Sequence, residues 1–212
     1  MEELFTNIKE GFLIIINGKQ RSGKSQLISY IMYCNRKNFQ YGISFSGTSF
    51  DPENLSYIPE KYKYMQYNET KLHNLMKIQQ SFPKEERPLA FVIFDDCIND
   101  KKQWNSKILL DLLTQLYHYN IVCIISTQYI NKIPALLREN ARLICIFKTD
   151  TLRSLEAAYE SYGQNYDTFK EFKNFLLEST GDYKFIVRDN KDASNFQIMR
   201  APKKIPSFTL NY

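Results

Sequence analysis

The sequence contains few of the residues that mark disulfide-bonded, metal-bound or flexible proteins. Among its 212 residues are four cysteines and two histidines, and no two cysteines form a C-x-x-C pair. A structural zinc site and a disulfide framework are therefore poor interpretations, and the free cysteines indicate a reducing compartment. Seven glycines and seven prolines are too few for long flexible linkers.

Long apolar runs are absent as well. The longest, such as residues 12–16, are far shorter than the roughly 20 residues that a membrane-spanning helix needs. The first ten residues lack the apolar core of a secretory signal, so we expect neither secretion nor a membrane partner. Hydrophobic residues make up 43% of the chain and charged residues 24%, which is typical of a globular protein and excludes disordered, collagen-like and coiled-coil classes.

The charge of the chain suits an anionic partner without requiring one. Its 28 basic and 23 acidic residues give a formal net charge of +5. A compact nucleic-acid-binding protein often has a larger excess or a basic tail. Motifs must therefore identify the partner.

The order of apolar segments predicts a three-layer α/β fold with a mainly parallel central sheet. Short apolar runs are typical of strands buried on both faces, and segments with helical spacing separate them. The predicted strands are residues 12–16, 41–46, 62–67, 89–94, 121–125 and 143–147, followed by a terminal hairpin at 183–188 and 195–200. The predicted helices are residues 24–36, 69–80, 101–119, 134–140, 151–161 and 166–178. The length suits one domain over 1–212, with a core at 12–148 and C-terminal helices and hairpin at 150–200.

Residues 18–25 read G-K-Q-R-S-G-K-S and match the phosphate-binding loop G-x-x-x-x-G-K-[ST], the Walker A motif. The match follows a predicted buried strand and opens a predicted helix. Glycines let backbone N–H groups approach a polyphosphate, and the helix N-terminus favours negative charge. We expect Lys24 to reach the β- and γ-phosphates of ATP and the Ser25 hydroxyl to bind Mg²⁺. The residues expected to contact the nucleotide are Gly18, Lys19, Gln20, Arg21, Ser22, Gly23, Lys24, Ser25 and Gln26.

A second motif, F-V-I-F-D-D, ends a predicted strand with Asp95 and Asp96. A carboxylate at the tip of a strand beside the phosphate loop can hold Mg²⁺ through its water shell, and we assign this role to Asp95. Asp96 is then the general base that polarises the attacking water, although an aspartate reaches less far than a glutamate. Asn99 is a weaker candidate for the same neighbourhood. A strand that simply ends in a polar turn is the alternative.

One extra predicted strand, 41–46, separates the phosphate loop from the acidic strand, which is the mark of the additional-strand class of P-loop proteins that includes RecA-like motors. In that class the strand after the acidic one, here 121–125, lies between the acidic strand and the phosphate-loop strand. Its tip reads Ser126-Thr127-Gln128, so Gln128 can hydrogen-bond both the γ-phosphate and the water. An ordinary polar strand end is the alternative.

Two arginines, Arg138 and Arg142, lie in the segment I-P-A-L-L-R-E-N-A-R before the next strand. In a ring of subunits such an arginine can face a neighbour's nucleotide, where its charge stabilises the transition state of hydrolysis. For either residue, a solvated charge at a helix end is the alternative.

These blocks in this order resemble the FtsK–HerA superfamily of DNA-pumping ATPases, and more closely the genome-packaging ATPases of large double-stranded DNA viruses, of the poxvirus and virophage type. The resemblance spans about residues 12–148 and rests on G-K-Q-R-S-G-K-S, F-V-I-F-D-D-C, I-I-S-T-Q and P-x-x-x-R-x-N. It implies an oligomeric ring that hydrolyses ATP and moves duplex DNA, without sequence preference, into a capsid. By motif position it implies functional roles for Lys24, Ser25, Asp95, Asp96 and Gln128, with Arg138 as the better arginine finger and Arg142 second.

The resemblance also implies partners and a place of action. A capsid or portal protein is the expected protein partner, in the cytoplasm of the host cell where virus assembles or on the virion. In the loop 101–107, Lys101, Lys102 and Lys107 could contact DNA phosphates with Trp104 as a brace. We favour the simpler interpretation of this loop, a solvated helix start with one core tryptophan.

Two other classes of function remain open. A small-molecule nucleotide kinase also has a phosphate loop, but it needs a phosphoacceptor pocket and an arginine-rich lid, and no lid-like run is evident. A nucleotide-dependent switch that hydrolyses slowly is the second alternative, and the intact pair of Asp95 and Asp96 weakly opposes it.

Overall fold

In the residues that the computed structural model describes, 2–47, 55–98, 100–191 and 196–212, an eight-stranded sheet forms the centre of the molecule. Its strand order is β3-β2-β4-β5-β1-β6-β7-β8. The first six strands pair in parallel, whereas β7 and β8 are antiparallel to their neighbours. The strands are β1 (Leu13–Asn17), β2 (Tyr41–Ser46), β3 (Lys63–Tyr64), β4 (Ala90–Asp95), β5 (Ile121–Thr127), β6 (Leu143–Phe147), β7 (Lys184–Asp189) and β8 (Gln197–Arg200).

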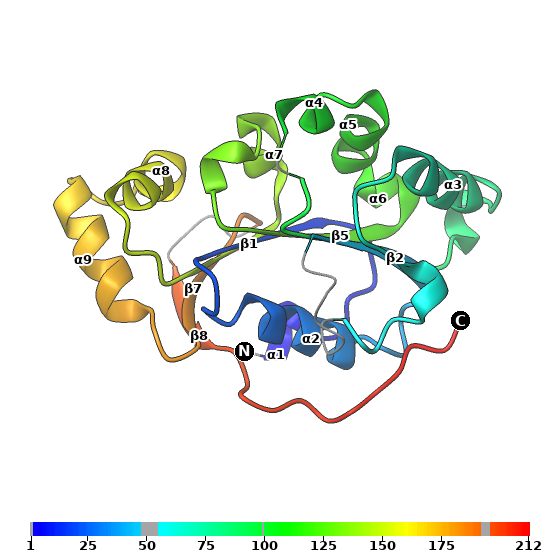
Figure 1. The fold of residues 1–212 in the computed structure, drawn as a ribbon, viewed down its shortest axis with the longest axis horizontal. Coiled ribbons are helices and arrows are strands. Elements are labelled where there is room, and N and C mark those ends of the chain that lie inside the picture. The colour runs from blue at the N-terminus through cyan, green and yellow to red at the C-terminus, as the bar shows by residue number, and fades with distance from the viewer. Residues whose placement is uncertain (1, 48–54, 99, 192–195) are drawn as a thin grey trace.

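Helices cover both faces of the sheet, which confirms the predicted three-layer architecture. Figure 1 shows α3 to α8 above the sheet, α9 beside β7 at the left end, and α1 and α2 below the sheet. The helices are α1 (Glu2–Phe5), α2 (Lys24–Cys34), α3 (Glu69–Gln80), α4 (Lys101–Trp104), α5 (Lys107–Thr114), α6 (Leu116–Tyr119), α7 (Ala135–Asn140), α8 (Leu152–Tyr162) and α9 (Phe169–Ser179), with short 3₁₀ turns η1 (Glu60–Tyr62), η2 (Lys84–Glu86) and η3 (Ile130–Lys132). None of the helices described is long and apolar enough to span a bilayer.

The central strands are apolar because both of their faces are covered. All five residues of β1 are buried. Leu13 and Ile15 belong to the hydrophobic core under the upper helices, whereas Ile14 and Ile16 belong to the core around α2. Alternate side chains of one strand thus enter different cores, as expected of a strand between two layers.

β5 lies between β4 and β1, so the predicted additional-strand arrangement is confirmed. Asp95 of β4 pairs with Ser126 of β5, and Asn17 of β1 pairs with Thr127 of β5. The carboxyl ends of the three strands therefore meet at one edge of the sheet.

The antiparallel hairpin of β7 and β8 extends the sheet beyond β6, where the sequence placed it. Ile144 of β6 pairs with Arg188 of β7, and Phe147 pairs with Phe185. Residues 192–195, which belong to the predicted hairpin and its connection, lie outside the described residues, as do residues 48–54.

Two predicted elements were wrong in extent. The helix predicted at 101–119 is three helices, α4, α5 and α6. The Ser106 side chain accepts a hydrogen bond from Leu109 N and so begins α5 as a new helix. Asn120, with a left-handed φ of 53°, caps the C-terminal end of α6. The strand predicted at 62–67 pairs over two residues only. Asn68 caps α3 by accepting from Lys71 N, so the chain leaves the sheet early.

The C-terminal segment 201–212, which the sequence analysis did not assign, crosses the face of α2 (Figure 1). The Phe208 ring stacks on Tyr57 with centroids 4.6 Å apart and meets Tyr33 of α2 edge-on at 5.5 Å. Leu210 is 1% exposed, and its N–H donates to Tyr57 O at 2.8 Å. The segment therefore packs as part of the lower core.

Replacing Leu210 by alanine should lower the free energy of unfolding by about 2 kcal/mol, because a buried leucine loses its contacts and leaves a cavity. Urea unfolding followed by circular dichroism measures this change. The control is Thr209→Ala at the exposed neighbouring position, with a change below about 0.5 kcal/mol. If the two variants unfold alike, Leu210 does not anchor the segment.

Candidate nucleotide-binding site

The predicted phosphate loop connects β1 to the first turn of α2, as its chemistry requires. At Gly18 a Cβ atom would come within 2.6 Å of Phe147 Cβ, so no larger residue fits. Gly23 has a φ of 113°, and a Cβ there would lie 2.9 Å from the Tyr183 ring. Gly18 is therefore needed because Phe147 approaches it closely, and Gly23 is needed for its left-handed backbone conformation.

Lys24 is buried at the first position of α2, with 7% of its surface exposed. Its Nζ donates to the carbonyl oxygens of Gly18 at 2.9 Å and Lys19 at 3.1 Å. Burial lowers the pKa of the Lys24 amine, and the nearby Asp96 and Asp95 oppose this shift. The ammonium group is thus held inside the loop, facing the acidic strand end.

The two aspartates after the apolar run occupy different positions. Asp95 is the last residue of β4, is 5% exposed, and accepts a hydrogen bond from the Ser46 hydroxyl at 3.4 Å. Asp96 turns away with a left-handed φ of 48°, which an aspartate tolerates better than most residues. Its Oδ2 lies 4.0 Å from Lys24 Nζ.

Gln128 follows β5 and binds Asp96 twice. Its backbone N–H donates to Asp96 Oδ1 at 3.2 Å, and its side-chain Nε2 donates to Asp96 Oδ2 at 3.0 Å. Lys24, Asp96 and Gln128, from three separate segments, therefore form one cluster at the carboxyl edge of the sheet. A cation, a carboxylate and an amide meeting in this way can bind and polarise a phosphate and a water.

The donor chemistry for Mg²⁺ is present at the same edge. Ser25 is exposed in the first turn of α2, and Asp95 lies one residue before Asp96. Hydroxyl and carboxylate oxygens are the hard donors that Mg²⁺ prefers.

The other loop residues have defined positions. Lys19 N donates to Lys148 O at 3.3 Å, and its Nζ pairs with Asp150 at 2.5 Å. Arg21 has a left-handed φ of 59°, and Gln20 is exposed. The Ser22 hydroxyl is buried and has no hydrogen-bond partner in the described part of the chain, which suits a loop built to receive oxyanions.

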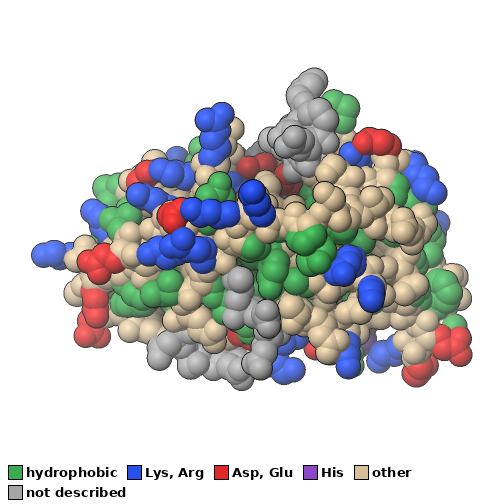
Figure 2. Space-filling model, turned by 90° about the horizontal axis from the view of Figure 1, so that it is seen from below, with side chains coloured by type: hydrophobic (Ala, Val, Ile, Leu, Met, Phe, Trp, Pro, Cys, Tyr) green, Lys and Arg blue, Asp and Glu red, His purple; other side chains and the backbone are tan. Residues whose placement is uncertain are grey.

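Lysine and arginine side chains gather on the left half of the face seen from below (Figure 2), the side on which Figure 1 draws β7 and β8. Gln26 Nε2 donates to Lys203 O at 3.2 Å, which places the C-terminal segment next to the start of α2. Lys203 and Arg200 both pair with Asp182, at 3.2 and 2.7 Å.

The two arginines lie away from this cluster within the chain. Arg138, in α7, donates from Nη1 to the Ser161 hydroxyl at 2.8 Å. Arg142 precedes β6, lies 3.4 Å from Glu10 and 3.8 Å from Asp189, and covers the Phe12 ring at 4.7 Å. Arg142 therefore lies at the amino end of β6, whereas the phosphate loop is at the carboxyl edge.

Residues of the predicted DNA loop are only partly described. Trp104 is 4% exposed, as expected of a core tryptophan, and Lys102 and Lys107 are exposed. Asn99 and the side chain of Lys101 lie outside the described residues.

Three residues at the site were missed by the sequence analysis. Ser46 ends β2 at the same edge as Asp95, so the rule that parallel strands end together could have identified it. Asp150 and Lys203 contact the loop from segments whose position depends on the tertiary fold, and no local signal marks them.

No model of a known protein family matches the chain. Uncharacterized protein 075L of Invertebrate iridescent virus 6 is 30% identical over 195 residues, which cover 89% of this chain and 74% of that protein. The chain belongs to the family of protein 075L. Uncharacterized protein L437 of Acanthamoeba polyphaga mimivirus is 26% identical over 193 residues, covering 84% of this chain and 66% of the mimivirus protein.

Solved structures share the fold of this viral family. The genome packaging NTPase B204 from Sulfolobus turreted icosahedral virus 2, in complex with AMP, has a TM-score of 0.67 at 18% identity, over 91% of this chain and 98% of B204. EssC (ATPases 2 and 3) from Geobacillus thermodenitrificans has a TM-score of 0.59 at 14% identity, over 92% of this chain and 41% of EssC. The fold is therefore that of the P-loop NTPases, as the sequence predicted.

Replacing Gly23 by alanine should lower the free energy of unfolding by about 2 kcal/mol, because the left-handed φ strains any side chain and the Cβ meets Tyr183. Thermal and urea unfolding measure the effect. Gln20→Ala, at an exposed position of the same loop, should leave stability within about 0.5 kcal/mol. A Gly23→Ala protein as stable as the control would contradict the assigned backbone conformation.

Proposed function

We propose that this protein is an ATP-hydrolysing motor that translocates double-stranded DNA and packages a viral genome into a capsid. The observation that supports this most is the position of the Asp96 carboxylate, whose Oδ2 is 4.0 Å from Lys24 Nζ and 3.0 Å from Gln128 Nε2. A base held between a phosphate-binding lysine and a glutamine that can reach both phosphate and water suits cleavage of a γ-phosphate.

In this proposal each residue of the cluster has one task. Lys24 binds the β- and γ-phosphates, and Asp96 accepts the proton of the attacking water. Gln128 exchanges its bond to Asp96 for one to the γ-phosphate when ATP enters. Ser25 and Asp95 would hold Mg²⁺, which supplies positive charge to the phosphate oxygens.

DNA as the partner is supported by charge and by the relatives. The net charge is +5, and basic side chains gather on one half of the face seen from below (Figure 2). The B204 protein, which shares the fold, is described as a genome packaging NTPase, and the relatives compared above are viral. Binding through phosphates alone suits a motor that must pass any sequence. A capsid or portal protein is the further partner, and the infected cell's cytoplasm or the virion is the place of action.

We also propose that the protein works as a homo-oligomeric ring in which Arg138 acts on a neighbour's nucleotide. Arg142 is the weaker candidate because Glu10 and Asp189 already lie beside its guanidinium. Arg138 donates to the neutral Ser161 hydroxyl and lies on the helix α7, within the R-x-N context.

Duplex DNA should raise the rate of ATP hydrolysis by this protein, and the increase should shrink as salt rises. The measurement is phosphate release across protein concentration, with and without duplex DNA. Lys24→Ala should reduce turnover to background, whereas Lys77→Ala, an exposed lysine on α3, should not. Full activity in Lys24→Ala would remove the phosphate-loop argument. DNA-independent turnover at low salt would favour a kinase or a switch.

Arg138→Ala should spare ATP binding and lower kcat by about 10³-fold, the lower end of what arginine fingers contribute. Mixing it with Lys24→Ala should restore activity, because each variant supplies what the other lacks. The control is Arg153→Ala, which changes an exposed arginine on α8. If no mixing ratio restores turnover, Arg138 does not act across subunits.

A further inference from the structure

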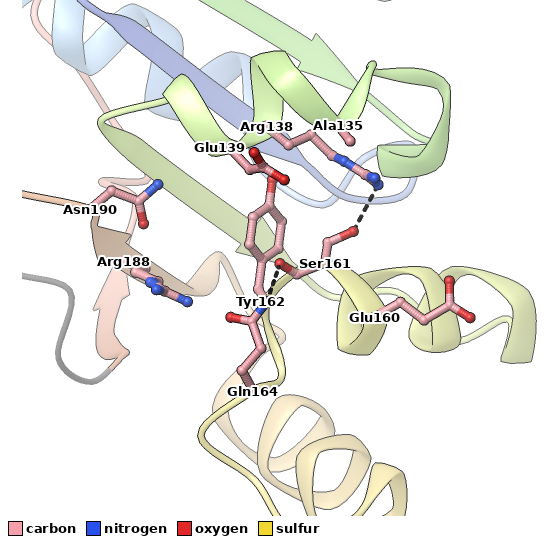
Figure 3. A pocket seen from close by; sticks show the side chains of 9 residues that line it. All are labelled: Ala135, Arg138, Glu139, Glu160, Ser161, Tyr162, Gln164, Arg188 and Asn190. Carbon is pink, nitrogen blue, oxygen red and sulfur yellow. Dashed lines mark hydrogen bonds between the residues drawn. The ribbon is translucent and has the colours of Figure 1, made fainter.

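A cleft between α7, α8 and β7 contains polar groups that the proposed cluster does not use. Its volume is about 330 Å³. Figure 3 shows Arg188 and Tyr162 pointing into the space between these elements, with Arg138 above them. The residues that line the cleft are Ala135, Arg138, Glu139, Glu160, Ser161, Tyr162, Gln164, Arg188 and Asn190.

Arg188 lacks a partner in this cleft. Its Nε is buried and makes no hydrogen bond, and it forms no ion pair within the part of the chain that the structure describes. A buried guanidinium N–H left unbonded costs free energy, and an anionic ligand from outside would offset that cost. A guanidinium binds carboxylate or phosphate oxygens best.

Tyr162 adds a second buried donor. It is 4% exposed, and its hydroxyl has no hydrogen-bond partner among the described residues. Burial raises the pKa of the phenol, and the charges of Arg138 and Arg188 oppose this shift. The hydroxyl therefore keeps its proton at neutral pH and is available to donate, and both arginines are close enough for their charges to act on it.

The two glutamates of the cleft form no ion pair with the arginines in the described structure. Neither Glu139 nor Glu160 lies within the 4.0 Å of Arg138 or Arg188 that would make an ion pair in the described structure. Figure 3 shows the Glu160 side chain pointing away from Arg188. An incoming anion therefore meets two guanidinium groups that have no acidic partner.

We propose that this cleft binds a phosphate group, with Arg188 and Arg138 as cationic ligands and the Tyr162 hydroxyl as a neutral donor. Two sources can present that group. One is the nucleotide bound to an adjacent copy, and this alternative rests on the proposed function. The other is the backbone of duplex DNA. The cleft lies towards the amino end of β6, since Arg188 pairs with Ile144, and Asn190 N donates to Arg142 O. It therefore lies towards the opposite edge from its own phosphate loop and is reached by another molecule.

The test uses Arg188→Gln and Tyr162→Phe, with Arg153→Gln on the exposed side of α8 as the matched control. Two measurements separate the sources. The first is kcat and KM for ATP, alone and after mixing with Lys24→Ala. The second is affinity for a random-sequence duplex without nucleotide, across salt concentration.

If an adjacent copy presents the phosphate, Arg188→Gln should lower kcat by about tenfold or more with little change in KM, and Lys24→Ala subunits should restore the rate. If DNA presents it, Arg188→Gln should instead reduce the slope of log affinity against log salt by about 1. Tyr162→Phe should lower kcat in the first case, or the affinity for DNA in the second, by roughly tenfold. It should not lower thermal stability, because the hydroxyl that it removes has no hydrogen-bond partner among the described residues.

The proposal is overturned if both variants match Arg153→Gln in both measurements. It is also overturned if Tyr162→Phe loses stability and no ligand property changes, since Tyr162 is then structural. Failure of the proposed function gives a different result: wild-type protein then hydrolyses ATP at full rate when dilute, or not at all. The DNA measurement alone then decides what the cleft binds.

Discussion

The parallel register of β4, β5 and β1 is the constraint on which the candidate site depends. Because these strands end at one edge, Gln128 after β5 meets Asp96 after β4, and both face the loop that holds Lys24. The individual hydrogen bonds are worth only about 1 kcal/mol each, so they cannot set this geometry by themselves. Apolar strands buried on both faces supply the rigidity, and the polar cluster results from strand order.

Lys24 shows how the cluster is kept ready for an anion. Burial lowers the pKa of the Lys24 amine, and the nearby Asp96 and Asp95 offset this lowering only in part. Its hydrogen bonds go to carbonyl oxygens of its own loop, which are neutral acceptors. In the proposed reaction an incoming phosphate therefore offers Lys24 a stronger hydrogen-bond acceptor than the two carbonyl oxygens that it bonds now. The same phosphate would compete with Asp96 for Lys24 and Gln128, which would release the Asp96 carboxylate towards water.

Motifs and hydrophobic runs predicted the layers, the inserted strand and the residues of the central cluster, because these follow from local pattern and strand order. What they missed depended on capping and long-range packing. Ser106 divides a continuous helical pattern by capping a new helix, and apolar periodicity cannot detect such a cap. Leu210 and Lys203 reach α2 from a segment without a pattern of its own, so only the tertiary fold shows their contacts.

The positions of the two sites limit how copies of the chain could assemble. The phosphate loop is at the carboxyl edge of the parallel strands, whereas the cleft with Arg188 lies towards the amino edge. If an adjacent copy's nucleotide fills the cleft, the phosphate-loop edge of one copy meets the cleft edge of the next. When such a contact is head-to-tail and closes on itself, it makes a ring.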